Sequence, residues 1–435
     1  MRHLPIDNEL FAENRERLSK LLPAGTLAIV NANDIQPTCA DGVMMMHPNS
    51  DIFYLTGIEQ EQSILLLFPN ALEPRNREIL FMRQPNKHLA VWEGHKHTKE
   101  QAREISGIEN VQWLSEFPTL FRILMCEAKG ACLNTNEHAR ADVTVETRDM
   151  RFIQETQQQF PLHQYHRLAP ILHHLRAIKS DAEIELLKIA VDITRKGFLR
   201  LLDFVKPGVT EHEVEAELAH EYIKNRGKFA YLPIVASGKD SCILHYIENK
   251  KTLQDGDLLL LDTASSYGNY NADLTRTIPV NGKFTQRQKD VYNAVLRVLR
   301  SSIKGATPGK MHSIWQKEAQ GMMNQELLEL GLITKDDINN QDPHEPACRK
   351  YFMHGLGHPL GLDVHDVARP ESPIQEGYVL TVEPGIYIPE EGFAVRLEDD
   401  IVITADGPVN LMDDIPIEAE EIEDLMHQSS PLFSQ

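Results

Sequence analysis

Two stretches of the chain carry carboxylates that would face each other across predicted hairpins. In "LLLLDTASSYGNYNADLTRTI" (258–278), two strand-like runs flank a Gly/Asn-rich turn. With the turn centred at 267–268, Asp262 lies opposite Asp273. Opposed side chains in a sheet are about 5 Å apart at Cβ. Two aspartates there would repel each other unless a cation lay between them.

A second hairpin is predicted in "VLTVEPGIYIPEEGFAVRLEDDI" (379–401), with its turn at 390–391. In this register Glu383 lies opposite Glu398. Arg396 precedes Glu398 by two residues and therefore shares its face of the strand. Most acidic residues near turns are simply exposed. Both of these pairs, however, interrupt aliphatic strand sequence, where an unpaired carboxylate is costly.

The charge of these groups suggests a metal centre. Four carboxylates carry as much negative charge as two divalent cations neutralise, and one neutral imidazole would add a ligand without charge. A hydroxide bridging two such ions can attack a carbonyl carbon. Oxygen-rich ligation with a single histidine favours Mn²⁺, and Co²⁺ or Zn²⁺ would also fit. We therefore expect a hydrolase with two divalent metal ions.

Three histidines, His354, His358 and His365, fall in "HGLGHPLGLDVHD" (354–366). The spacing of the first two resembles that of a zinc-protease helix. A glycine inside a helix costs about 1 kcal/mol and a proline about 3 kcal/mol. The glycines and the proline of this stretch therefore predict a loop that carries histidines into a cleft. His245, shortly before the first acid hairpin, is a further candidate for substrate contact.

The second half of the chain has the elements needed to carry these residues. Three capping boxes predict helix starts: Ser180 with Glu183, Thr210 with Glu213, and Thr285 with Gln288. Gly227 is expected to end the second of these helices. Strand-like runs lie at 258–263, 272–280, 378–383 and 394–404.

The first half predicts an α/β domain. Buried strands are expected at 26–30, 63–68 and 78–83, and a helix at 98–105. The stretch 164–180 has the composition of a connector. We therefore expect two domains, 1–170 and 171–435.

Composition excludes several classes of protein. The 435 residues carry a formal net charge of −20, which argues against nucleic-acid binding. The five cysteines form no C-x-x-C pair, which is typical of a reduced intracellular protein. The N-terminal sequence has no apolar signal region, and no apolar run is long enough to span a bilayer. A cytoplasmic location without membrane association is expected.

These motifs resemble a known family. The order Asp, Asp, His, Glu, Glu, with "HGLGHPLGLDVHD", "TVEPGIY" and "VRLEDDIVIT", is similar to the M24 metallopeptidases, and within them to the Xaa-Pro aminopeptidase (aminopeptidase P) type. "MMMHPNSDIFYLTGIEQEQSILLLF" resembles the N-terminal domain of that type, and "PIEAEEIEDLM" its C-terminal end. The resemblance implies an α/β N-terminal domain followed by an α+β pita-bread catalytic domain of the creatinase/aminopeptidase kind. It also implies release of the N-terminal residue from peptides with proline in second position, by a homodimer or homotetramer.

The resemblance also implies roles for particular residues. The metal ligands would be Asp262, Asp273, His358, Glu383 and Glu398. Of these, Asp273 and Glu398 would bridge the two ions, and Glu383 would also act as the proton shuttle.

Other residues would face the substrate. His354, His365 and His245 would hydrogen-bond the scissile peptide and stabilise the tetrahedral intermediate. Arg396 would orient the site, and Tyr231 would line the pocket.

Three alternatives remain at this point. A prolidase, which cleaves only Xaa-Pro dipeptides, has the same ligand set, and activity on a tripeptide would distinguish the two. The stretch "HPNSDIFYLTG" favours the aminopeptidase. A metal-free binding protein or a metal-free creatine-type amidinohydrolase could share the fold, but the intact acid pairs argue against both.

Overall fold

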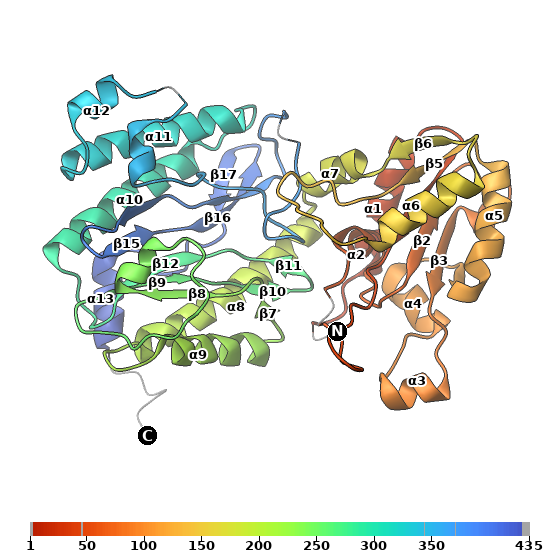
Figure 1. Ribbon diagram of the computed structural model, residues 1–435, viewed down its shortest axis with the longest axis horizontal. Helices are drawn as coiled ribbons and strands as arrows, with labels where there is room; N and C mark the ends of the chain where they lie inside the picture. The colour runs from red at the N-terminus through yellow and green to blue at the C-terminus, as the bar shows by residue number, and fades with distance from the viewer. Residues whose placement is uncertain (1–2, 45–46, 343, 370, 429–435) are drawn as a thin grey trace. The chain divides into compact units, whose positions relative to one another are not determined.

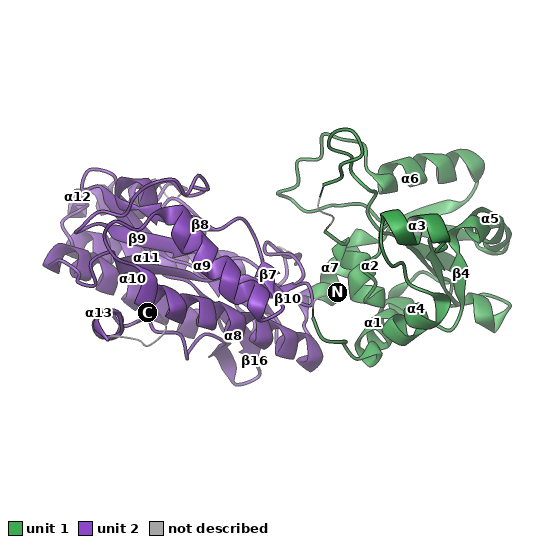
Figure 2. Ribbon diagram, turned by 90° about the horizontal axis from the view of Figure 1, so that it is seen from below, with its two compact units in different colours: residues 1, 3–176 green, residues 2, 177–435 purple. Residues whose placement is uncertain are grey.

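The computed structural model describes residues 3–44, 47–342, 344–369 and 371–428. The chain forms two compact units, the first ending at Arg176 and the second beginning at Ala177 (Figure 2). The residues proposed for chemistry all lie in the second unit.

The first unit is built on a six-stranded mixed sheet in the order β4-β3-β2-β1-β5-β6 within the described residues (Figure 1). Its strands are β1 (Thr26–Asn31), β2 (Ile64–Leu67), β3 (Glu78–Met82), β4 (Val111–Trp113), β5 (Gly130–Leu133) and β6 (Gln164–Arg167). Its helices are α1 (Asn8–Leu21), α2 (Ser50–Thr56), α3 (Lys87–Trp92), α4 (Lys99–Ser106), α5 (Phe117–Glu127), α6 (Arg148–Gln159) and α7 (Ala169–Ala177).

Both faces of this sheet are covered. Leu27, Ile29 and Phe81 lie on one face and pack in a cluster with Phe121 and Leu124 of α5. Because successive side chains of a strand point to opposite faces, the intervening residues are buried on the other side. The predicted strands and the predicted helix at 98–105 are confirmed.

The prediction of a connector at 164–180 was wrong. β6 pairs in parallel with β5, and α7 follows it. Leu168, between the two elements, and Leu172 of α7 are fully buried. β6 lies at the sheet edge, and its side chains are exposed or only partly buried. An exposed edge strand needs no apolar pattern, so its polar sequence resembled that of a loop.

The second unit combines antiparallel strands with long helices. Its helices are α8 (Asp181–Phe204), α9 (Glu211–Lys224), α10 (Gln286–Gly305), α11 (His312–Glu329), α12 (Lys335–Asn339) and α13 (Ala419–His427). Its strands are β7 (Lys228–Phe229), β8 (Ile234–Ser237), β9 (Leu258–Asp262), β10 (Ser265–Tyr267), β11 (Tyr270–Asn271), β12 (Thr275–Pro279), β13 (Val379–Val382), β14 (Gly385–Ile388), β15 (Phe393–Arg396), β16 (Asp399–Thr404) and β17 (Gly407–Asn410).

Two helix pairs cover these strands. α8 packs on α9, and this pair contacts β7, β8, β10 and β11. α10 packs on α11 and contacts β13, β14, β15 and β17. In Figure 1 the strands that carry the candidate site run between the two pairs.

The three predicted capping boxes are confirmed at the starts of α8, α9 and α10. The predicted role of Gly227 is wrong, because Arg226 takes the positive φ of 67° after α9. Gly227 is needed for a different reason. A Cβ there would lie 2.3 Å from the Ser265 hydroxyl, so only glycine allows this close approach.

None of the helices in the described ranges has the length and apolar content needed to cross a membrane.

Candidate metal centre and active site

The first acid hairpin forms, but in a different register from the one predicted. Asp262 lies opposite Thr275 instead of Asp273. Gly268 and Asn269 both have positive φ, as a type I′ turn requires, so the turn centre lies one residue further along. The partner of Asp262 therefore shifts by two residues, and an even shift leaves Asp273 on the same face of the hairpin.

The predicted register of the second acid hairpin is confirmed. β14 pairs with β15 so that Gly385 lies opposite Arg396, and β13 continues the same register against β16. Glu383 and Glu398 lie between these two ladders. They therefore face each other across the gap.

The two hairpins meet edge to edge through Thr275, which forms an isolated bridge with Glu398. The Thr275 hydroxyl donates to Glu398 Oε2 at 2.7 Å and accepts from Arg396 Nε at 3.1 Å. Arg396 Nη2 also donates to Asp262 Oδ2 at 2.5 Å. One buried guanidinium thus connects an acid of the first hairpin with an acid of the second.

His358 is held in a loop, as predicted, and not in a helix. Its backbone bonds to Thr381 of β13 in both directions. Ring Nδ1 lies 3.0 Å from the Pro359 carbonyl, to which it can only donate. Nε2 therefore carries the lone pair, and it points at Asp273 Oδ2 (3.6 Å) and Glu383 Oε1 (3.8 Å). A lone pair aimed at carboxylates is the orientation of a metal ligand.

The buried carboxylates of the site repel one another. Burial, and then the charge of Asp262, raise the pKa of Asp273 well above its usual range. Burial, and then the charges of Asp273 and Glu383, do the same to the pKa of Glu398. The Tyr231 hydroxyl lies 2.7 Å from Asp262 and 2.6 Å from Asp273, but its one proton serves one carboxylate at a time.

These groups fit a divalent cation. Ligand atoms of Asp273, His358 and Glu398 lie within 4.8 Å of one another, and all three residues are buried. Oxygen donors with one imidazole suit hard and borderline divalent ions. A cation there would offset the burial and the mutual repulsion that together raise the pKa values of Asp273 and Glu398.

Both ring nitrogens of His354 have hydrogen-bond partners within the protein. Its Nδ1 donates to the Gly355 carbonyl at 2.8 Å, and its Nε2 accepts from the Tyr387 hydroxyl at 2.8 Å. Burial and the nearby charge of Arg396 lower the pKa of His354 to about 3, so the ring is neutral. Nδ1 also lies 3.6 Å from Glu383 Oε2.

The other two predicted histidines are exposed at the edge of the site. The rings of His365 and His358 are perpendicular, with centroids 4.4 Å apart. His245 lies close enough for its charge to help lower the pKa of His354. His354 therefore lies beside Glu383, with His245 near it, and His365 lies against His358.

Four site residues were missed by sequence reasoning: Thr275, Thr381, Tyr387 and Asp400. The side chain of Tyr387 connects His354 with Arg396 Nη1, which donates to its hydroxyl at 2.8 Å. Asp400 Oδ2 accepts the backbone N–H of Asp273 at 3.0 Å. Asp400 could have been found by alternation, because it follows Glu398 by two residues. Thr275 required the correct register.

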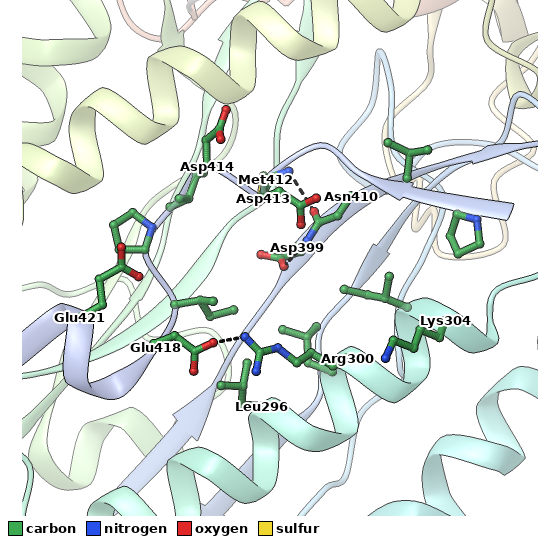
Figure 3. A pocket seen from close by; sticks show the side chains of 17 residues that line it. Leu296, Arg300, Lys304, Asp399, Asn410, Met412, Asp413, Asp414, Glu418 and Glu421 are labelled. Carbon is green, nitrogen blue, oxygen red and sulfur yellow. Dashed lines mark hydrogen bonds and ion pairs between the residues drawn. The ribbon is translucent and has the colours of Figure 1, made fainter. Parts of the chain in front are cut away.

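A cavity of about 890 Å³ lies on the other side of β16 (Figure 3). Asp399 lines it and pairs with Arg276 and Asn410, whereas the neighbouring Asp400 points to the acid cluster. None of the residues that line this cavity is a candidate catalytic or metal-binding residue. The cavity is therefore separate from the candidate site.

Comparison with known proteins agrees with the fold and the site. Residues 185–405 match metallopeptidase family M24, and residues 11–132 match the N-terminal domain of aminopeptidase P. Fold and site together define a metal-dependent peptidase with the predicted pita-bread catalytic domain. The chain belongs to metallopeptidase family M24.

Relatives specify the type within the family. The chain is 35% identical to the Xaa-Pro aminopeptidase of Escherichia coli over 97% of its length and 98% of that protein. It is 33% identical to Xaa-Pro aminopeptidase 3 of Homo sapiens, over 88% of this chain and 77% of that protein.

Solved structures of aminopeptidase P proteins have the same fold as this chain. A Bacillus anthracis protein assigned as an aminopeptidase P has a TM-score of 0.90 and 34% identity, covering 98% of this chain and all of that one. The zinc-substituted Escherichia coli aminopeptidase P in complex with product has a TM-score of 0.86 and 33% identity. The match covers 97% of this chain and 99% of that one. These relatives favour an aminopeptidase over a prolidase.

Proposed function

We propose that this protein is a metal-dependent aminopeptidase that releases the N-terminal residue from peptides with proline in second position. The observation that carries the proposal is the convergence of Asp273, His358 and Glu398, with Glu383 beside them, in a chain that matches Xaa-Pro aminopeptidases along nearly its whole length.

We assign the metal ligands to Asp262, Asp273, His358, Glu383 and Glu398, holding two divalent ions of which Mn²⁺ fits best. The number of carboxylates supports two ions, and the single imidazole supports a preference for oxygen ligands. Divalent ions held there would lower the pKa of a water molecule and polarise the scissile carbonyl.

Glu383 is the residue we assign to proton transfer. Its backbone is fixed by a hydrogen bond to the Leu356 carbonyl at 2.7 Å, and its side chain is less buried than those of Asp273 and Glu398. Glu383 would accept the proton of the attacking water and deliver it to the proline nitrogen as the peptide bond breaks.

The remaining residues would bind and orient the peptide. His354, His365 and His245 would hydrogen-bond the scissile peptide and stabilise the charge that develops on its carbonyl oxygen. Arg396 fixes Asp262 and Tyr387, and Tyr231 lies over the first acid pair. A bond preceding proline has no N–H to bind, so recognition must rely on the ring and the carbonyls.

The test is hydrolysis of a panel of peptides after loading with Mn²⁺. Xaa-Pro-Xaa peptides are expected to release their first residue, peptides with alanine in second position to resist, and Xaa-Pro dipeptides to be cleaved more slowly. An Asp273→Asn variant is the negative control. Failure to cleave any proline-second peptide with Mn²⁺, Co²⁺ or Zn²⁺ would exclude the proposal, and a strict dipeptide preference would indicate a prolidase.

We also propose a homodimer or homotetramer and a cytoplasmic location. The first rests on the family resemblance and the second on the cysteine content of the sequence. Light scattering on the purified protein tests the first, and fractionation of the source cells tests the second.

A further inference from the structure

A buried ion pair closes the loop that carries His358 and His365. Lys179 Nζ lies 3.0 Å from Asp366 Oδ2, and both side chains are only 1% exposed. Lys179 stands just before α8, at the start of the second unit, while Asp366 directly follows His365. The pair thus joins two segments that are far apart in the sequence.

Asp366 fixes the shape of this loop. Its N–H donates to the Pro359 carbonyl at 2.9 Å, so that residues 359–366 double back on themselves. Its Oδ1 accepts from Val367 N at 2.9 Å, which leaves Oδ2 for Lys179. His358 and His365 stand at the two ends of the closed loop, with ring centroids 4.4 Å apart. Asp366 therefore holds the segment that joins the two histidines.

The loop is built closely around the ion pair. A Cβ on Gly361 would lie 2.2 Å from Asp366 Oδ2 and 2.9 Å from Lys179 Cε. On the other side, the Asn271 side chain donates to the carbonyls of Gly361 and Leu362 at 3.0 and 2.9 Å. The Lys179 backbone is itself anchored, because its N–H donates to the Gly377 carbonyl at 2.8 Å. Both partners are thus held rigidly.

Stability alone does not account for such a pair. Replacing a buried ion pair by apolar residues of similar volume is often neutral or stabilising, because both charges must be removed from water. A buried ion pair does fix the relative position of the two segments that carry its charges, here Lys179 and the 359–366 loop. We propose that Lys179 and Asp366 are positioning residues, which hold His365 against His358 and so orient the peptide for cleavage.

This inference rests on the proposed function only for its kinetic consequence. The structural consequence, the position of the His365 ring, does not depend on which peptide is cleaved. The two can therefore be tested separately.

The experiment compares Lys179→Met with the double variant Lys179→Met/Asp366→Asn. The single variant removes the charged partner of the buried Asp366 carboxylate and is expected to lower the unfolding temperature. The double variant removes that charge while the amide oxygen that replaces the carboxylate can still accept from Val367 N, so its unfolding temperature should return toward that of the parent. Its kcat/KM on an Xaa-Pro-Xaa peptide should stay about 10–100-fold below the parent, with Mn²⁺ affinity, measured by calorimetry, within about threefold because His358 keeps its own anchors on β13.

The matched control is Arg200→Met. Arg200 is a part-buried cation of α8 that pairs with Glu217 of α9, and neither residue belongs to the 359–366 loop. This variant should lose stability and keep the parental kcat/KM. If the double variant regained both stability and kcat/KM, the pair would be only structural and the proposal would be wrong.

A crystal structure of the double variant gives the readout that is independent of activity. The His365 ring is expected to move away from His358. An unchanged ring separation would overturn the proposal even if the peptide activity proved different from the one proposed. Parental protein that cleaves no proline-second peptide would contradict the proposed function, and the ring position would still decide the role of the pair.

Discussion

The five proposed ligand side chains differ in burial, and the difference agrees with the tasks proposed for them. The Asp273 side chain is 7% exposed and Glu398 as a whole residue is 2% exposed, whereas the Glu383 side chain is 20% exposed. A bridging carboxylate benefits from low dielectric surroundings, since attraction to a cation is stronger there. A carboxylate that exchanges protons with substrate must reach the open side of the site. Burial therefore separates the two acids that we propose as bridging ligands from the proposed proton shuttle.

Glu383→Ala is expected to abolish turnover. Loss of a positioned general acid–base group lowers kcat by about 10²–10⁴-fold, and loss of a metal ligand would lower it further. Rates are measured on an Xaa-Pro-Xaa peptide with saturating Mn²⁺, with circular dichroism to check folding. Glu390→Ala, an exposed acid in the turn of the same hairpin, is the control and should keep the parental rate. Parental rates in Glu383→Ala would rule out the proton-shuttle role.

Asp149 in the first unit makes stability depend on pH. Burial raises the pKa of Asp149 from 3.8 to about 6, although Asn31 Nδ2 donates to it at 2.8 Å. Because the folded pKa lies above the unfolded one, the stabilising contribution is complete below about pH 4 and is lost as the pH rises through about 6. The loss amounts to about 2–3 kcal/mol for a shift of this size.

Asp149→Asn should therefore match the parent near pH 4 and be more stable than it at pH 7.5. Urea unfolding at the two pH values measures the difference. Asp142→Asn, at an exposed position of the same unit, should show no pH-dependent difference. A constant difference between Asp149→Asn and the parent at both pH values would contradict the assignment.

At the scale of elements, the acid hairpins could be predicted because alternation and turn chemistry are local. The second register was correct since its turn is symmetric about Glu390–Glu391. The first was displaced because the turn needs two residues with positive φ, and Gly268–Asn269 supply them. The sequence contained that signal. The face of the sheet on which the acids lie was still predicted correctly, because the register was displaced by an even number of residues.

Contacts between distant segments could not be predicted in this way. Thr275 meets Glu398 only because two hairpins lie edge to edge, and Lys179 meets Asp366 although 187 residues separate them in the sequence. No periodicity relates such positions. The polar edge strand β6 was missed for another reason, because edge strands lack the apolar pattern that reveals buried ones.

At Gly357 the histidine loop lies directly against the backbone of β13. A Cβ there would lie 2.0 Å from the Thr381 carbonyl oxygen, a backbone atom that cannot move aside. Gly357→Ala should therefore push the loop off the strand, displace His358 and weaken Mn²⁺ binding at least tenfold, an effect of about 1.4 kcal/mol or more. Calorimetric titration with Mn²⁺ measures it.

Gly321→Ala is the matched control. Gly321 lies inside α11 with open space around it, so alanine there should raise stability by about 0.5–1 kcal/mol and leave Mn²⁺ binding unchanged. Equal Mn²⁺ affinity in Gly357→Ala and the parent would show that His358 does not depend on this approach.

At the scale of the whole molecule, the two units should respond differently to metal removal. All proposed ligands lie in the second unit, so chelation should lower the unfolding temperature of that unit alone. Adding Mn²⁺ back at about 1,000 times its dissociation constant should stabilise the second unit by about 4 kcal/mol.

Calorimetry that resolves both transitions tests this expectation. Asp273→Asn serves as the control, since its second transition should no longer respond to Mn²⁺. If metal removal shifted the unfolding transition of the first unit, or shifted neither transition, the assignment of the ligands to the second unit would be wrong.

The position of the site residues along the chain also bears on how the protein is made. The proposed ligands begin at Asp262 and end at Glu398, which lies between β15 and β16. Domains generally fold as units while the chain emerges from the ribosome, N-terminal part first. The first unit can therefore fold early in synthesis. The proposed metal centre cannot form until the chain has emerged as far as Glu398, so a nascent chain carries its acidic ligands uncompensated until then.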